Sequence, residues 1–207
     1  IQEGFETLAE VRAMPVVDFT GWADSGDRAG RAWEVTFGSL FAGIGGFDLG
    51  LERAGMKCKW QVEIDPYARR VLEKHWPDVR RWDDVRTFPP DGEWGVDLIC
   101  GGFPCQDISL AAASFGGGID GPQTGLWREL ARIICVLRPR LVLLENVSII
   151  TARGWGLVCG KLAAVGYDTR WTCIPASAVG ALFEGTRFFC LAETTGERSE
   201  KSSIFDQ

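Results

Sequence analysis

The chain has 207 residues, of which 46% are hydrophobic and 24% charged, and this composition excludes a disordered or low-complexity protein. No run approaches the roughly 18 apolar residues of a membrane span, so we expect neither a membrane partner nor a secretory leader. The formal net charge of −6 counts against tight, unaided binding to nucleic acid, because phosphate contacts need Lys and Arg.

Strand and helix patterns alternate along the chain from about residue 35. An apolar run at 35–41 predicts the first strand, and a helix follows at 46–55, where Gly55 suits a C-terminal cap. The remaining elements are, in order, a strand at 59–64, a helix that Pro66 opens and that runs to His75, a strand at 96–100, a helix at 126–137, a strand at 141–145, a helix at 155–165 and closing strands at 167–174 and 187–192.

This alternation predicts an α/β fold in which a mostly parallel sheet carries helices on both faces. We divide the chain into an N-terminal extension of unknown role at 1–34, one α/β domain at 35–192 and a polar tail at 193–207. Ligands bind such sheets at the carboxyl ends of the strands, so we expect chemistry in the loops that follow them.

Seven scattered cysteines without a Cys-x-x-Cys pair do not form a disulfide framework or a zinc site. This usage indicates a reduced, cytosolic protein. The single histidine, His75, excludes a histidine metal cluster, and we expect no metal. Cys58, Cys100, Cys135, Cys159, Cys173 and Cys190 lie in or beside apolar stretches, as buried structural cysteines do, whereas Cys105 does not.

Two of the strand ends indicate a site for an adenosine-containing ligand. Phe-Ala-Gly-Ile-Gly-Gly-Phe at 41–47 allows close backbone approach and opens a helix with free N–H groups, although a tight turn alone would also explain it. Glu63 ends the next strand, where an acid commonly binds ribose hydroxyls or is merely solvated. The spacing is GxGG rather than GxGxxG, which weakens a nicotinamide reading and leaves another adenosine cofactor open.

Two further strand ends carry reactive groups. Pro104 fixes the chain before Cys105, so this thiol is presented rather than buried and is a candidate nucleophile. Glu145 follows a strand rich in leucine, where burial would raise its pKa and suit it to donate a proton. The alternative for Glu145 is a capping acid for the next segment.

Together these clusters resemble the cytosine-C5 methyltransferases of bacteria and phages. The matching text is FAGIGGFDLGL (41–51), VEIDPYARRVLEKHWP (62–77), DLICGGFPCQDIS (97–109), GLWRELARII (125–134), LENV (144–147) and PASAVGALFEGTRFFCLA (175–192). The resemblance implies a Rossmann-like, S-adenosylmethionine-dependent methyltransferase fold, with 35–192 as the catalytic domain.

The resemblance also implies the roles of individual residues in catalysis. Cys105 would add to C6 of a cytosine flipped out of duplex DNA, Glu145 would bond N3, and Arg187 would contact the target base region. Gln106, Ser109 and Asn146 would lie at the substrate, with Asn146 shaping the loop that carries the nucleophile.

For S-adenosylmethionine, the resemblance implies a pocket made by successive strand ends. The glycine turn would hold the methionine part, Glu63 the ribose, and Asp84 the adenine amino group. The full set implied is Phe41, Gly43, Ile44, Gly45, Glu63, Ile64, Asp84, Val85, Pro104 and Leu126.

Three departures from the family pattern concern the recognition of DNA. The family's target-recognition domain has no counterpart here, so we expect a fragment or one half of a split enzyme, whose partner chain recognises the target. Gly185 stands where the family carries the first of two arginines, and Glu184 beside it has the wrong sign for DNA. The segment 109–121, which follows the nucleophile, has no Lys or Arg.

We therefore expect a DNA cytosine-C5 methyltransferase of a bacterium or phage, cytoplasmic and associated with the nucleoid. The main alternative is an inactive relic that binds S-adenosylmethionine, which the altered 182–187 segment favours. An RNA cytosine methyltransferase would need an RNA-binding surface of interleaved aromatic and basic residues, which is not seen. A nicotinamide oxidoreductase would leave Cys105 and Glu145 unexplained.

Overall fold

The computed structural model describes residues 34–104 and 125–195, and within them seven strands form one sheet. The strand order across the sheet is β3-β2-β1-β4-β5-β7-β6. The strands are β1 (Thr36–Leu40), β2 (Lys57–Val62), β3 (Arg80–Trp82), β4 (Leu98–Gly102), β5 (Leu141–Val147), β6 (Tyr167–Pro175) and β7 (Thr186–Thr194).

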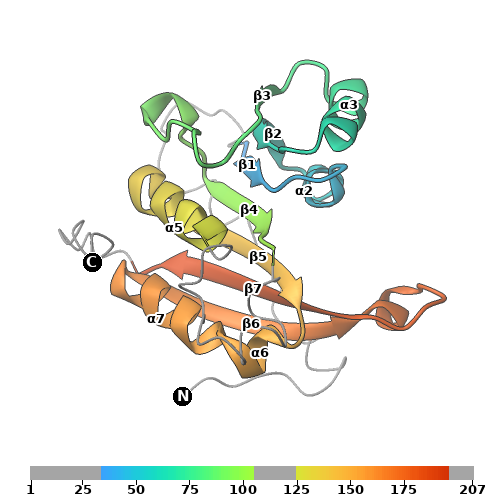
Figure 1. Cartoon of the computed structure of the whole chain (residues 1–207), viewed down its shortest axis with the longest axis vertical. Coiled ribbons are helices and arrows are strands. Elements are labelled where there is room, and N and C mark those ends of the chain that lie inside the picture. Colours follow the sequence, from blue (N-terminus) through green and yellow to red (C-terminus); the bar gives the residue numbers. More distant parts are fainter. Residues whose placement is uncertain (1–33, 105–124, 196–207) are drawn as a thin grey trace.

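Helices and short 3₁₀ turns connect these strands (Figure 1). They are α2 (Gly46–Arg53), α3 (Pro66–His75), η2 (Gly92–Trp94), α5 (Gly125–Leu137), α6 (Ile150–Arg153), α7 (Trp155–Ala164) and η3 (Ala176–Val179).

The strand directions confirm the expected α/β fold with a mostly parallel sheet. The strands β1 to β5 pair parallel to their neighbours, and β7 lies antiparallel between β5 and β6. The chain builds outward from β1 to β2 and β3, and then returns to place β4 on the other side of β1. In sheets of this kind, ligands bind where the direction changes, which here is at the carboxyl ends of β1 and β4.

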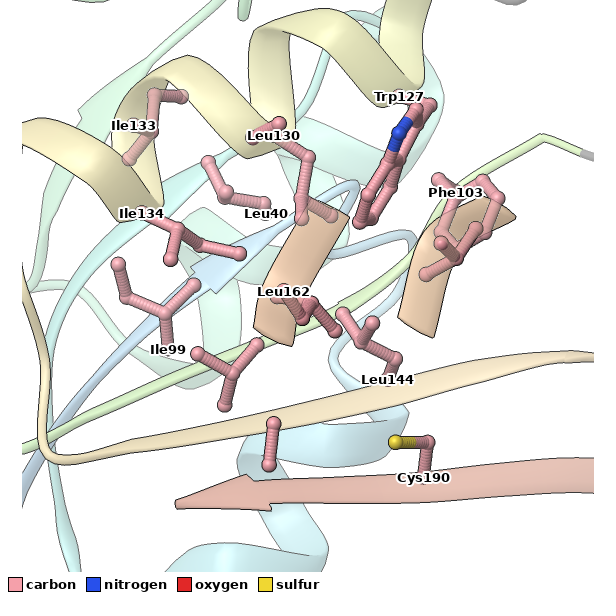
Figure 2. Packing of buried hydrophobic residues seen from close by; sticks show 14 of the residues in the cluster. Leu40, Ile99, Phe103, Trp127, Leu130, Ile133, Ile134, Leu144, Leu162 and Cys190 are labelled. Carbon is pink, nitrogen blue, oxygen red and sulfur yellow. The ribbon is translucent and has the colours of Figure 1, made fainter. Parts of the chain in front are cut away.

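Helices cover both faces of the sheet, as the sequence predicts. On one face α5 and α7 pack against the strands and complete the larger core cluster, part of which is drawn in Figure 2. On the other face Phe47 and Leu51 of α2 pack against a smaller cluster around Phe37 and Cys100. Both clusters hold the strands rigidly, so the loops at the strand ends have a fixed base.

Local signals explain why α3 begins and ends where the sequence predicts. The side chain of Asp65 accepts a hydrogen bond from the N–H of Ala68 at 2.7 Å, and Pro66 occupies the first helical position. Lys74 and His75 lie in the last turn, where positive charge suits the helix dipole.

The prediction missed one strand and misplaced the ends of others. It missed β3, whose three residues pair only with β2 and show no apolar run. It ended the leucine-rich strand at Glu145, whereas β5 continues to Val147 because β7 pairs with it as far as Arg187. The strand β2 begins and ends two residues earlier than the predicted 59–64, and β4 two residues later than the predicted 96–100.

The N-terminal extension lies outside the described residues except for Glu34, and so does the tail beyond Thr195. The strand β7 runs two residues past the expected domain end at 192. Among the described residues, no helix is long and apolar enough to cross a membrane.

Candidate functional site

The glycine loop, residues 41–46, bends sharply between β1 and α2. Gly43 and Gly45 have φ angles of 55° and 92°, in the left-handed region that favours glycine, and Phe41 adopts φ 54°. A β-carbon on Gly43 would meet no atom of the described residues within 4 Å. The outer side of this loop is therefore open to a ligand.

Glu63 ties the glycine loop to the loop that follows β2. Its carboxylate accepts a hydrogen bond from the N–H of Gly43 at 2.7 Å and another from the N–H of Asp65 at 2.8 Å. The backbone N–H of Glu63 itself donates to the carbonyl of Trp82 in β3. The structure thus places Glu63, the residue predicted to bind the ribose, against the predicted glycine turn.

Trp76, which the sequence analysis missed, packs its ring against Gly45 of the glycine loop. A β-carbon on Gly45 would lie 2.4 Å from the Trp76 ring, so only glycine fits there. The indole N–H of Trp76 donates to Glu52 of α2 at 2.8 Å, which fixes the ring. A tryptophan just after a helix gives no signal of this contact in the sequence.

Two isoleucines beside Glu63 are exposed to solvent. Ile44 of the glycine loop is 63% exposed, and Ile64, directly after Glu63, is 60% exposed. Exposed branched apolar side chains suit the faces of an aromatic ring such as adenine. Ile64 is the residue predicted to cover one face of the adenine, whereas Ile44 was predicted near the methionine part, and both roles stay predictions.

Asp84 opens a turn, residues 84–88, that follows β3. Arg86 donates to both carboxylate oxygens of Asp84, at distances from 2.7 to 3.0 Å. These bonds lower the pKa of Asp84 below its usual value, which keeps the group ionised and able to accept further hydrogen bonds. An amino group is the kind of donor such a carboxylate accepts from.

Val85 and Leu126 pack into the protein interior rather than facing solvent. The side chain of Val85 is 5% exposed and belongs to the larger core cluster, against which the partly buried Leu126 packs. Pro104 is exposed at the end of β4. Of these three residues predicted to contact the cofactor, Val85 is a core residue that holds its own loop in place.

Asn146 anchors the chain just before the predicted nucleophile. It is 3% exposed, and its side-chain amide donates to the carbonyl of Phe103 at 3.0 Å while its oxygen accepts from the N–H of Val147 at 2.9 Å. Phe103 in turn packs on Trp127 of α5, with ring centroids 5.4 Å apart (Figure 2). These contacts agree with the predicted role of Asn146 in shaping this loop.

Glu145 lies inside β5, directly opposite Gly102 of β4 in the sheet register. A β-carbon on Gly102 would lie 2.7 Å from Oε2 of Glu145, so glycine makes room for the carboxylate. Gly101 is equally confined, because a β-carbon there would lie 2.7 Å from the carbonyl oxygen of Leu40. The carboxylate therefore sits at the end of the strand that leads to Cys105.

Arg187 of β7 pairs with Glu145 of the neighbouring strand β5. Its Nε lies 3.5 Å from Oε1 of Glu145, and the two side chains are 57% and 28% exposed. Burial raises the pKa of Glu145 above its usual value, and Arg187 partly offsets that effect. A carboxyl group in this state can donate or share a proton with a ligand.

The segment between β6 and β7 carries apolar side chains into solvent. Leu182 is fully exposed and Phe183 is 68% exposed, with the Phe183 ring 3.6 Å from where a β-carbon on Gly185 would lie. In Figure 1 this segment reaches past the end of β5. Gly185, which stands where the family carries an arginine, thus lies beside exposed apolar side chains near the carboxyl ends of the strands.

Cys105, Gln106 and Ser109 lie outside the described residues, so their predicted roles stay predictions. None of the six described cysteines forms a disulfide, and burial raises the pKa of the Cys58, Cys100 and Cys190 thiols. A high pKa makes a poor nucleophile, which agrees with a structural role. Within 34–104 and 125–195, no group of three potential ligand residues could hold a metal.

A buried polar network, also missed by the sequence analysis, lies beneath the glycine loop. Asp48 in the first turn of α2 is fully buried and accepts from Ser39 at 3.0 Å, from Gln61 at 2.8 Å and from the Cys58 thiol at 3.4 Å. These partners belong to β1 and β2, so the network fixes α2 against the two strands that carry the site.

Comparisons with known proteins point to one family. The family model for the C-5 cytosine-specific DNA methylase matches residues 35–207. A type II methyltransferase of Bacillus subtilis, M2.BsuMI, is 34% identical over 180 residues, which cover 82% of this chain and 44% of that protein. M.CviJI of a Paramecium bursaria Chlorella virus is 32% identical over 155 residues, or 74% of this chain and 41% of that protein.

A solved structure supports the same fold. Entamoeba histolytica methyltransferase EhMeth superposes with a TM-score of 0.70 at 19% identity, over 81% of this chain and 55% of that one. The chain spans less than half the length of the two curated relatives. The match over 35–207, together with these relatives, shows that the chain belongs to the C-5 cytosine-specific DNA methylase family.

Proposed function

We propose that the chain is the catalytic part of a DNA cytosine-C5 methyltransferase. The observation that carries the proposal is the half-buried Glu145, which has a raised pKa, faces Gly102 and is paired with Arg187. A carboxyl group held beside the strand that leads to Cys105 suits a flipped-out cytosine, whose N3 needs a proton or hydrogen bond as charge develops.

The nucleophilic step belongs to Cys105. Its thiolate adds to C6 of the cytosine, forming a carbon–sulfur bond and making C5 nucleophilic, while Glu145 bonds N3 and stabilises the charge. After C5 has accepted a methyl group, a base or water removes the C5 proton. The carbon–sulfur bond then breaks, which releases Cys105 and 5-methylcytosine. Asn146 supports this step by holding the carbonyl of Phe103 just before the nucleophile.

The pocket residues fit S-adenosylmethionine, which supplies an electrophilic methyl group on a sulfonium. The open side of Gly43 admits the methionine part close to the backbone. Glu63 would accept from ribose hydroxyls, the exposed Ile64 would cover one face of the adenine, and the ionised Asp84 would accept from its amino group, while the exposed Ile44 would lie near the methionine part.

Duplex DNA is the substrate we propose, in the cytoplasm of a bacterium or of a phage-infected cell. Gly185 lacks the charge of the family's arginine, and Glu184 adds a negative one. We therefore propose that a partner chain, or a further part of the same protein, supplies target recognition. An inactive protein that binds S-adenosylmethionine is the second candidate, favoured by the same altered segment.

The test is transfer of labelled methyl from S-adenosylmethionine to mixed-sequence duplex DNA, with Cys105→Ala as the control. Transfer that the Cys105→Ala variant loses, while it still binds the cofactor, supports the proposal. Residual transfer by that variant contradicts the proposed nucleophile. Cofactor binding without transfer, even when the recognition region of a relative is added, favours the inactive protein.

A further inference from the structure

Arg132 of α5 reaches the turn at 84–88 from a helix more than 40 residues later in the chain. Its Nη2 donates to the carbonyl of Val85 at 3.0 Å and to the carbonyl of Phe88 at 3.2 Å. Its Nε donates to Glu129, one turn earlier in α5, at 2.7 Å. The guanidinium is therefore held at one edge by its own helix while another of its nitrogens binds the turn.

The turn depends on this contact because its own hydrogen bonds are local. The N–H of Thr87 donates to the carbonyl of Asp84 at 3.0 Å, and the N–H of Arg86 donates to the Asp84 carboxylate at 2.9 Å. These bonds shape the turn but do not fix it relative to the sheet. The buried side chains of Val85 and Phe88, the hydrogen bond from the Trp82 indole of β3 to Thr87, and the hydrogen bonds from Arg132 do that.

Only an arginine is suited to this geometry. Its guanidinium is planar and always charged, and it presents several donors in fixed directions, so one side chain can bind Glu129 and two carbonyls together. A lysine has a single ammonium on a flexible stem and could not keep the same set of contacts at the same positions. The side chain is about one-third exposed, so its role is not that of a core residue.

We propose that Arg132 is a positioning residue for cofactor recognition: it fixes the 84–88 turn against α5 so that the Asp84 carboxylate is held at the adenine amino group. The inference rests on the proposed function, because it assumes that Asp84 reads the adenine. It adds that the selectivity for adenine depends on a residue in α5 that does not itself contact the ligand.

The test measures how well variants distinguish two probes that differ only at the purine. S-adenosylhomocysteine carries the amino group that Asp84 accepts from, and S-inosylhomocysteine carries a carbonyl in its place. Calorimetry gives the dissociation constant of each probe for wild type, Arg132→Gln and Arg132→Lys. Arg170→Gln serves as the matched control, because Arg170 is an exposed arginine on β6.

We expect wild type to prefer the adenosyl probe by at least tenfold. Arg132→Gln should bind it about tenfold more weakly and lose most of the preference, Arg132→Lys should lie between, and Arg170→Gln should match wild type. Thermal melting of each variant checks that the fold is kept. A structural weakening alone would lower both affinities equally and leave their ratio unchanged.

The outcomes separate this inference from the function on which it rests. If wild type binds neither probe, the proposed cofactor site fails and the inference fails with it. If wild type binds and prefers the adenosyl probe while Arg132→Gln keeps the same ratio, the inference alone is overturned.

Discussion

Oε2 of Glu145 lies 2.7 Å from the position that a β-carbon on Gly102 would take. The two residues face each other across β4 and β5, so the smallest side chain on one strand makes room for the carboxylate on the other. The position of the candidate acid is therefore set by the residue opposite it as much as by its own strand.

Gly102→Ala is expected to push the Glu145 carboxylate out of place while the sheet still forms. Misplacing a catalytic group by about 1 Å can cost roughly 100-fold in rate, and we expect a loss of methyl transfer of this order. The measurement is turnover at saturating cofactor, with circular dichroism to follow the fold. Gly50→Ala is the control: nothing described lies within 4 Å of that β-carbon, so turnover should stay at wild type. Equal activity of both variants would contradict the steric argument.

Glu145→Gln is expected to lower turnover by about 10²- to 10⁴-fold, the usual share of a general acid or base. Its effect on stability should depend on pH. Because burial raises the pKa of Glu145 in the folded state, the folded protein binds more protons, so its stability falls as pH rises through that pKa.

Glu145→Gln removes this ionisation, so wild type should lose stability relative to the variant as pH rises from about 4, the ordinary pKa of Glu, through the raised pKa of the folded state. Urea unfolding of both proteins at several pH values measures the difference. A difference that is constant with pH, or that changes in favour of wild type, would contradict the raised pKa.

Glu63→Ala should weaken binding of S-adenosylmethionine by roughly 1–3 kcal/mol, the cost of losing a charged hydrogen-bond partner. The carboxylate also holds the N–H groups of Gly43 and Asp65, so its loss frees the glycine loop as well. Calorimetric titration gives the dissociation constant. Glu73→Ala, on the exposed face of α3, should bind as wild type does. An unchanged constant for Glu63→Ala would remove this residue from the site.

Asp48→Ala should destabilise the fold by roughly 3 kcal/mol, because Ser39 and Gln61 both lose a charged acceptor in a buried place. Asp48→Asn should cost less. Oε1 of Gln61 has no hydrogen-bond partner among the described residues and can accept from the new amide. Urea unfolding compares both variants with Asp78→Ala, whose side chain is exposed. Equal stability of Asp48→Ala and wild type would show that the network contributes nothing to folding.

Features that depend on neighbours in the sequence were predicted well. The bounds of α3 follow from Asp65 and Pro66, which act within one turn. The places of the glycine loop and of Glu63 were also predictable, since both follow strands of a parallel sheet and such strands end on one side.

Features that depend on distant partners were not predicted. The burial of Asp48 requires Ser39 and Gln61, which meet it only when α2 packs on β1 and β2. Arg132 looks like any solvated helix residue until the turn at 84–88 is placed beside it. The length of β5 follows from its pairing with β7, which the sequence of β5 does not contain.

The aromatic residues beneath the 84–88 turn include tryptophans, whose fluorescence depends on their surroundings. Trp60, Trp82 and Trp94 all pack on or beside Phe88, and the indole N–H of Trp82 donates to the Thr87 hydroxyl at 3.0 Å. That hydroxyl donates in turn to the carbonyl of Asp84. A ligand that engages Asp84 therefore changes the surroundings of a natural fluorophore, so tryptophan emission should follow occupancy of this pocket without any attached dye.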